Sequence, residues 1–231
     1  MPKLIKLEMK KFKIGGYIRG TLIANLVIIG ILLIILIGSK SEEELAFNDY
    51  NFAFMLMGSL VKATFIVFAS VMLSRLVIEE YKTGTITQLF MYPINRKKLL
   101  WAKLIIVLVF TFVATFITNI FIDGALIIIN NFYQFIPDKL TKTMLIYNFI
   151  SISMNSLTTS SMALIPLYFG MKKKSAQVTI VSSLLIVAIV CSNINGLSLG
   201  SIIAIPITLA VIGVLIAFLT IRNIEHIDVS N

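Results

Sequence analysis

Long apolar runs separated by short polar stretches dominate the chain. Six of these runs are long enough to cross a bilayer, which requires about 20 apolar residues in an α-helix. They cover approximately residues 21–38, 52–78, 99–122, 144–170, 176–194 and 202–221. Lipid offers no hydrogen bonds to backbone N–H and C=O groups, so each run is expected to be helical. The pattern therefore predicts an all-α integral membrane protein with six transmembrane helices.

Polar residues mark the predicted ends of the spans. Asp123 and Gly124 interrupt the third run, and residues 125–129 either extend that helix or lie at the membrane interface. Glycine, proline and polar residues gather in the segments between the later runs. Loops or turns are therefore expected at residues 130–143, 171–175 and 195–201.

The composition agrees with a chain that is solvated largely by lipid. Of its 231 residues, 58% are hydrophobic and 13% are charged, and the mean hydropathy is +0.97. A soluble domain is roughly 45–50% apolar and 25% charged, so one globular core could not bury these residues. No polar segment is long enough to form a soluble domain. Residues 1–231 are therefore interpreted as a single transmembrane domain.

Basic residues are distributed unevenly between the segments that flank the spans. Of the 20 lysines and arginines, only Lys40, Lys62, Lys139 and Lys142 lie outside the segments predicted to face the cytoplasm. Lysine and arginine near span ends are retained on the cytoplasmic side during insertion. The asymmetry predicts two cytoplasmic termini and a multi-pass protein of the plasma membrane. It also accounts for the net charge of +9 without a nucleic-acid partner.

Residues 1–16 carry a cluster of lysines interleaved with apolar residues. This pattern fits a basic amphipathic helix that lies on the inner membrane surface. A disordered basic tail that only sets the topology is the alternative. The apolar run that follows is too long for the core of a signal peptide, so it is interpreted as a retained first span.

The chain lacks the sequence features of an enzyme with its own ATP or metal site. A Walker A loop requires two spaced glycines before Lys and Ser or Thr, and residues 170–175 lack that spacing. His226 and Cys191 are the sole histidine and cysteine, which excludes a zinc site. Glu79 and Glu80 are similar to the glutamate pair of CAAX-type membrane proteases, but no predicted span contains a histidine. We therefore expect no catalytic residue, cofactor or metal in this chain.

The segment between the second and third spans has the most distinctive pattern. Thr83, Gly84 and Thr85 form a predicted turn with a helix N-cap, and Pro93 is expected to end the short helix that follows. One face of that helix is apolar and consists of Ile86, Leu89 and Phe90. Periodicity leaves two interpretations open, a hairpin that rests on lipid headgroups or a docking helix for a cytoplasmic partner.

A longer motif extends across this segment and into the third span. It has the form E-x-x-x-G-T-x-x-x-L-x-x-x-P-x-x-R-x-x-x-x-x-x-K, and its positions are occupied by Glu80, Gly84, Thr85, Leu89, Pro93, Arg96 and Lys103. The motif resembles the coupling-helix region of ABC type-2 exporter permeases. The six spans, the basic N-terminal helix and the short loops are also similar to that family. The resemblance is closest to small stand-alone permeases of Gram-positive bacteria that handle bacitracin, lantibiotics or phenol-soluble modulins.

The resemblance implies both the partners and the mechanism of the chain. It implies a separate cytoplasmic ABC ATPase that binds ATP and Mg²⁺, and a second permease subunit in a homodimer or heterodimer. It also implies export of amphipathic antimicrobial or toxin peptides, or of hydrophobic drugs. The residues expected to couple the ATPase to the spans are Glu79, Glu80, Thr83, Gly84, Thr85, Leu89, Phe90, Pro93 and Arg96. Because the predicted loop between the last two spans is shorter than in some relatives, no outer gate is assigned.

Two features inside the predicted spans are candidates for a translocation path. The fourth span carries a polar stripe that consists of Asn148, Ser151, Asn155 and Thr158. Such a stripe should face protein or a path rather than lipid, and ordinary helix–helix hydrogen bonding is the alternative. Lys62 lies inside the second span. It is interpreted as a path residue, as a snorkelling side chain or as an ion-pair partner of Asp123.

Two other classes of function fit parts of the pattern. An accessory or immunity membrane protein that binds a toxin peptide without pumping it would need only a membrane anchor and a binding surface. A carrier or channel acting alone would usually show an internal repeat or several intramembrane ionisable residues. Neither feature is visible in the sequence. A neighbouring gene for an ATPase would favour the exporter over the accessory protein.

Overall fold

The computed structural model describes residues 5, 7–9, 15–41, 49–82, 96–133, 135–136, 140–194, 197–198 and 204–222. Within these ranges the chain is helical apart from one short hairpin and the residues that connect the elements. Its elements are α2 (Gly15–Ser41), α3 (Tyr50–Leu73), the π-helical turn η1 (Ser74–Ile78), α4 (Glu79–Lys82), α6 (Arg96–Tyr133), α7 (Lys142–Met162), α8 (Pro166–Lys173), α9 (Ala176–Cys191), β1 (Asn193–Ile194), β2 (Leu197–Ser198) and α10 (Ala204–Arg222). The predicted helical membrane architecture is confirmed.

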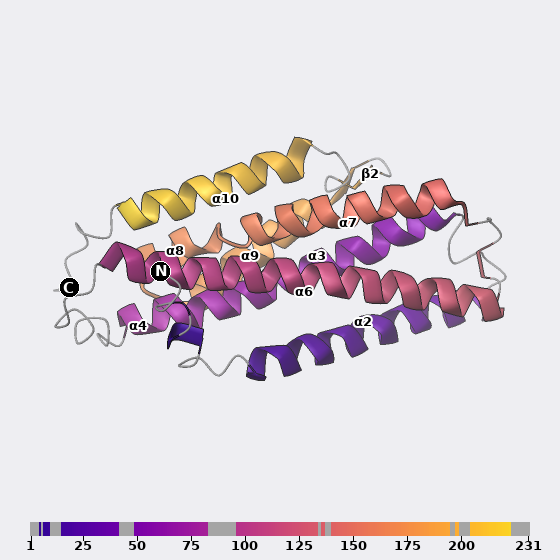
Figure 1. The fold of residues 1–231 in the computed structure, drawn as a ribbon, viewed down its shortest axis with the longest axis horizontal. Helices are drawn as coiled ribbons and strands as arrows, with labels where there is room; N and C mark the ends of the chain where they lie inside the picture. The colour runs from indigo at the N-terminus through magenta and orange to yellow at the C-terminus, as the bar shows by residue number, and fades with distance from the viewer. Residues whose placement is uncertain are drawn as a thin grey trace.

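The helices run side by side along one long axis (Figure 1). Helix α2 leads away from the end of the bundle that holds α4 and α8, and α3, η1 and α4 return to that end. Helix α6 leads away again, α7 and α8 return, α9 leads away and α10 returns. The antiparallel strands β1 and β2 lie between α9 and α10. The start of α2 and the end of α10 therefore share one end of the bundle.

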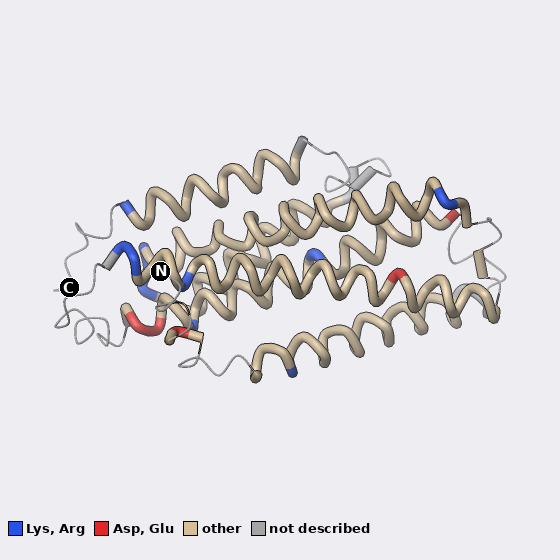
Figure 2. The backbone as a smooth tube through the Cα atoms, viewed as in Figure 1, with Lys and Arg blue, Asp and Glu red and all other residues tan. Residues whose placement is uncertain are grey.

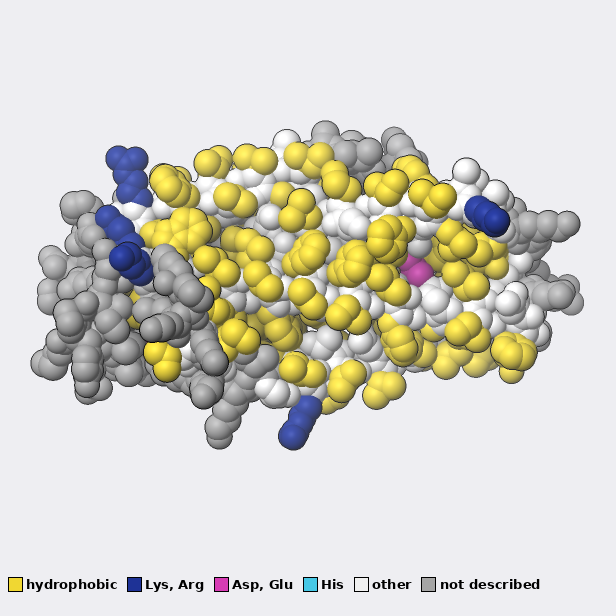
Figure 3. Space-filling model, viewed as in Figure 1, with side chains coloured by type: hydrophobic (Ala, Val, Ile, Leu, Met, Phe, Trp, Pro, Cys, Tyr) yellow, Lys and Arg dark blue, Asp and Glu magenta, His cyan; other side chains and the backbone are white. Residues whose placement is uncertain are grey.

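Several helices are suited to a bilayer rather than to water. Four stretches in the described part are long and apolar enough to cross a membrane, namely Gly15–Gly38, Tyr50–Tyr81, Lys97–Tyr133 and Ile205–Arg222, and Ala176–Cys191 is a shorter apolar helix. Leu26 and Ile34 on α2 are 70% and 72% exposed, and hydrophobic side chains cover the middle of the face in Figure 3. Soluble proteins rarely expose so much contiguous apolar surface. The chain is therefore a multi-pass membrane protein.

Lysine and arginine gather at the end of the bundle where α2 and α6 begin and α4, α8 and α10 end (Figure 2). We call this the basic end and the opposite one the far end. The basic residues of the described helices near the basic end are Arg19, Arg75, Lys82, Arg96, Lys97, Lys98, Lys103, Lys172, Lys173, Lys174 and Arg222. Lys40, near the end of α2, and Lys142, at the start of α7, lie at the far end.

The segment predicted as the fourth span, residues 144–170, is not one unbroken helix. Helix α7 ends at Met162, and Pro166 begins the separate helix α8. Proline has no N–H, so the carbonyl of Met162 cannot receive the usual bond from position 166. The connecting turn is tighter, because the amide of Ile165 donates to the Met162 carbonyl oxygen at 2.9 Å. The sequence pattern missed this break because the residues on both sides are apolar.

The third span is longer than predicted. Helix α6 continues through Asp123 and Gly124 to Tyr133, so residues 125–129 extend the helix and residues 130–133 are not a loop. Asn130 stabilises the turn that follows. Its Nδ2 donates to the Tyr50 hydroxyl at 2.6 Å, and its Oδ1 accepts from the Ile136 amide at 2.8 Å.

Smaller differences concern the ends of the other spans. Helix α2 begins at Gly15, which the sequence assigned to the interfacial helix, and the helical run of the second span continues to Lys82 instead of ending at Ile78. Helix α9 ends at Cys191, before the predicted residue 194. Of the predicted interfacial helix, residues 5 and 7–9 are helical, and most of the remainder lies outside the described residues.

Candidate functional site

A cavity of about 830 Å³ lies in the half of the bundle nearer the far end. The first turns of α3, α7 and α10 contribute Asn51, Thr143 and Pro206 to its wall. Asn119 from the second half of α6 and Val190 from the end of α9 also line it. Ligand cavities in proteins have volumes of about 300–1,000 Å³, so this one could hold a drug-sized molecule.

The cavity brings together all five residues predicted for the translocation path. Lys62 of α3 lines it with the α7 residues Asn148, Ser151, Asn155 and Thr158. The polar stripe of the fourth span therefore lies on a cavity wall. That these residues contact a transported substrate remains a prediction.

Hydrogen bonds within α7 hold most of this stripe in place. Asn155 Nδ2 donates to Ser151 Oγ at 3.2 Å. The Thr158 hydroxyl donates to the backbone carbonyl oxygens of Asn155 and Met154, at 3.0 and 3.1 Å. Asn148 instead reaches another helix, because its Nδ2 donates to Asp123 Oδ2 at 2.7 Å. One member of the stripe therefore bonds across helices, and all four members line the cavity.

Asn119 and Asp123 of α6 also line the cavity, and the sequence analysis did not include them among the path residues. A signal for them was present, because Thr111, Thr115, Asn119 and Asp123 recur every four residues and so share one helix face. All four side chains are buried. The Asn119 Nδ2 donates to the Thr115 carbonyl oxygen at 2.8 Å, which fixes the amide at the cavity.

Lys62 is 6% exposed and lines the cavity away from both ends of α3. The ion pair with Asp123 that the sequence suggested is not formed. Asp123 is bonded to Asn148, and within the described part of the chain no carboxylate lies within ion-pairing distance of Lys62. The Lys62 side chain is therefore buried in the protein and borders the cavity, and Cys191 lies close enough to interact with it electrostatically.

A second polar cluster lies near the basic end and joins the two ends of the sequence motif. Lys103, 2% exposed, forms an ion pair with Glu80, which is itself buried. Lys103 Nζ also donates to the Leu76 carbonyl oxygen at 2.9 Å and lies 3.9 Å from Glu8 Oε2. We call Glu8, Glu80 and Lys103 the buried charge cluster. It links the N-terminal segment, α4 and α6.

The turn before Glu80 is π-helical. In η1 the amide of Glu79 donates to the Ser74 carbonyl oxygen, five residues earlier. Single π-helical turns inside α-helices occur frequently at functional sites. Here the turn also contains the Leu76 carbonyl that Lys103 contacts. Thus the backbone and the ion pair together fix the direction in which the chain leaves α3.

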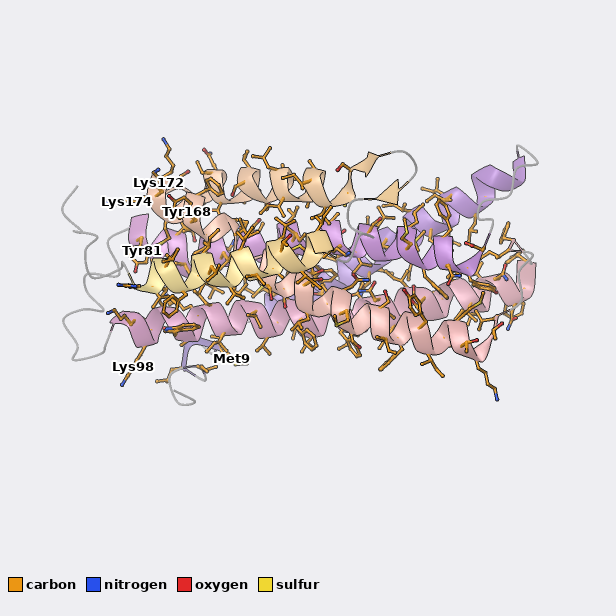
Figure 4. All side chains as sticks on the ribbon, turned by 90° about the horizontal axis from the view of Figure 1, so that it is seen from above. Met9, Tyr81, Lys98, Tyr168, Lys172 and Lys174 are labelled. Carbon is orange, nitrogen blue, oxygen red and sulfur yellow. The ribbon has the colours of Figure 1, made fainter. Side chains whose placement is uncertain are left out.

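Three of the predicted coupling residues lie in the described helices. Glu79 and Glu80 lie in α4, and Arg96 is the first residue of α6. Outside the described residues lie Thr83, Gly84, Thr85, Leu89, Phe90 and Pro93. The basic end carries both aromatic and basic side chains, and Figure 4 labels Tyr81, Lys98, Tyr168, Lys172 and Lys174 there. The Lys172 Nζ lies 5.9 Å from the centroid of the Tyr168 ring.

The described part of the chain contains no group of three or more His, Cys, Asp or Glu side chains that could hold a metal ion. The buried charge cluster is held by contacts within the chain, so it is a structural cluster rather than a ligand set. The cavity, by contrast, has room for a bound molecule.

Comparison with known proteins agrees with this arrangement. The family model described as "ABC-2 family transporter protein" matches residues 4–224. The chain is 38% identical over 225 residues to the uncharacterized protein YcbO of Bacillus subtilis (strain 168), and the alignment covers 97% of this chain and 99% of that relative. No solved structure matches the chain significantly. Since the family model spans almost the whole sequence, the chain belongs to the ABC-2 family of transporter proteins.

Proposed function

We propose that the chain is the membrane-spanning permease subunit of an ATP-binding-cassette exporter. It crosses the plasma membrane six times, with α7–α8 and α9 as the two spans beyond the four long apolar stretches. The basic end faces the cytoplasm, because lysine and arginine are retained there. Both termini then lie on the cytoplasmic side, and the cavity lies in the outer half of the membrane.

The observation that carries this proposal is the cavity. Its polar wall consists of Lys62, Asp123, Asn119 and the α7 stripe, and its apolar wall includes Phe54, Met55, Met144 and Ile207. Polar groups that face lipid are costly. Here they line the cavity, where they can form hydrogen bonds with the polar part of a ligand. An amphipathic peptide segment or a hydrophobic drug with one polar group has matching chemistry.

The energy source in this proposal is a separate ATPase subunit that binds ATP and Mg²⁺. Residues 83–95 contact that subunit at the basic end, and a second permease subunit, identical or related, completes the complex. The buried charge cluster holds α4 to α6 at the two ends of this segment. A movement of the ATPase would then be passed to α3 and α6, which both line the cavity.

Site-specific photo-crosslinking tests the proposed contact with the ATPase. A photoreactive amino acid at Leu89 should crosslink to a cytoplasmic ATPase in native membranes, because Leu89 lies in the proposed docking segment. The control is Ile146, which is 63% exposed near the far end, and its adduct should be lipid or a membrane protein. Equal ATPase crosslinking from both positions, or none from Leu89, would contradict the proposed docking site.

A further inference from the structure

The cavity contains one cationic side chain that lacks a counter-charge. Lys62 is 6% exposed, and within the described residues it has neither a hydrogen bond nor an ion pair. Burying an ammonium group without a partner is costly, so buried charges are normally paired. Inside a membrane such a group marks a ligand or ion site by default. The counter-charge for Lys62 is therefore expected to come from a bound molecule.

The position of Lys62 relative to Asp123 restricts what that molecule is. Helices α3 and α6 are antiparallel, and Gly58 lies beside Asn119, since a Cβ at Gly58 would be 3.8 Å from Asn119 Oδ1. Lys62 is one turn nearer the basic end than Gly58, and Asp123 is one turn nearer the far end than Asn119. At a rise of about 1.5 Å per residue, the two charged residues are offset by roughly 12 Å along the bundle. An anionic group at Lys62 is thus separated from the like charge of Asp123.

The uncharged residues of the cavity wall indicate the chemistry of the rest of the ligand. Asn119 and Asn155 offer uncharged hydrogen-bonding groups between or beside the two charged residues, and Met55, Ile150 and Met154 offer apolar surface. Met154 and Ile150 are also about half exposed on the surface of α7. An apolar chain bound along them would therefore remain in contact with the lipid.

We propose that the cavity binds a single-chain anionic amphiphile, with Lys62 pairing with its carboxylate or phosphate head group. The proposal of this binding site rests on the cavity and Lys62, and it does not require the chain to be an exporter. That the amphiphile is also the exported substrate rests on the function proposed above. Asp123 lowers the affinity for the anion without preventing its binding, because the charge lies about two helical turns away.

Equilibrium binding to the full-length chain in nanodiscs of zwitterionic phosphatidylcholine tests this proposal without any ATPase. The probe is 11-(dansylamino)undecanoic acid, followed by its fluorescence, and its uncharged carboxamide is the matched ligand. A charge-assisted contact of this kind should make the acid bind about tenfold or more tightly than the amide. Equal affinities for the acid and the amide would overturn the proposal.

Variants of Lys62 and Lys142 test which lysine causes the preference for the acid over the amide. Lys62→Met should abolish the preference for the acid, and Lys62→Arg should retain it because the charge remains. Lys142→Met is the matched control, since Lys142 is exposed at the far end and does not line the cavity. A preference that survives in Lys62→Met, with the folded state checked by size-exclusion chromatography, would contradict the assignment of Lys62.

Two further ligands and one further variant complete the test. Inorganic phosphate should not displace the probe at comparable concentration, because it lacks the apolar chain, and efficient displacement would overturn the assignment of an amphiphile. Asp123→Asn should increase the affinity for the acid, because it removes a like charge from the cavity, and a decrease in affinity would contradict the arrangement. Failure of ATPase association leaves these outcomes unaffected, so the two proposals can fail separately.

Discussion

Replacing Lys103 by methionine should destabilise the protein by about 3–5 kcal/mol, because it removes the cation that forms an ion pair with the buried carboxylate of Glu80. Glu8 Oε2, 3.9 Å from Lys103 Nζ, loses the same cation. For a chain of this size, the loss corresponds to a decrease of roughly 10 °C in the midpoint of thermal unfolding. Heating the detergent-solubilised protein and measuring the remaining monodisperse fraction by size-exclusion chromatography would detect it.

Lys98 provides the control for this prediction. It lies on the same helix near the basic end, and its side chain is exposed, so Lys98→Met should change the midpoint by less than about 1 °C. The double variant Lys103→Met with Glu80→Gln should recover part of the stability, because an unpaired buried charge costs more than a neutral pair. A Lys103→Met protein as stable as the wild type would show that the buried charge cluster is not what holds α4 against α6.

Cysteines introduced into the α7 stripe should react with a membrane-impermeant thiol reagent at least about tenfold faster than cysteines that face lipid. Thiol chemistry requires the thiolate, which forms in a hydrated cavity and not in hydrocarbon. The test positions are Asn148, Ser151 and Asn155. The native Cys191, whose Sγ donates to the Ser59 carbonyl oxygen at 3.8 Å, is first replaced by alanine so that it cannot react with the reagent.

Leu157 and Phe149 are the matched controls on the same helix. Both are more than half exposed and neither lines the cavity, so cysteines there should label slowly in intact membranes. Mass spectrometry of protein purified after a timed reaction gives the labelled fraction. Equal rates at the stripe and control positions, or labelling of the stripe only after unfolding in detergent, would mean that the stripe does not line an open cavity.

The helical membrane fold could be predicted because lipid leaves the backbone few alternatives. The helix boundaries could not be predicted equally well. Where α6 passes Asp123, the carboxylate accepts a hydrogen bond from Asn148 on another helix, and the π-helical turn η1 precedes a buried ion pair with Lys103. Both features involve contacts between residues far apart in the sequence, which a local pattern does not contain. The break before Pro166 carried a local signal, the proline itself, which the apolar pattern outweighed.

For the candidate site, too, the sequence pattern predicted which residues share a helix face but not how the helices pack. Periodicity along α7 was sufficient to group Asn148, Ser151, Asn155 and Thr158, because they share one helix face. Asn119 and Asp123 share a face of α6 in the same way, but the threonines beside them resembled the ordinary polar content of a membrane helix. That α3, α6 and α7 enclose one cavity is a property of packing, and no single-helix pattern contains it.

The central claim is that this chain is a permease subunit driven by a separate ATPase. The most direct test is to purify the tagged chain from its native membrane in mild detergent and identify the proteins that come with it. We predict a cytoplasmic ABC ATPase in stoichiometric amount, together with a second copy of this chain or a related permease. Recovery of the chain without an ATPase, under conditions that keep a control exporter assembled, would contradict the claim and favour an accessory or immunity protein that binds its ligand without pumping it.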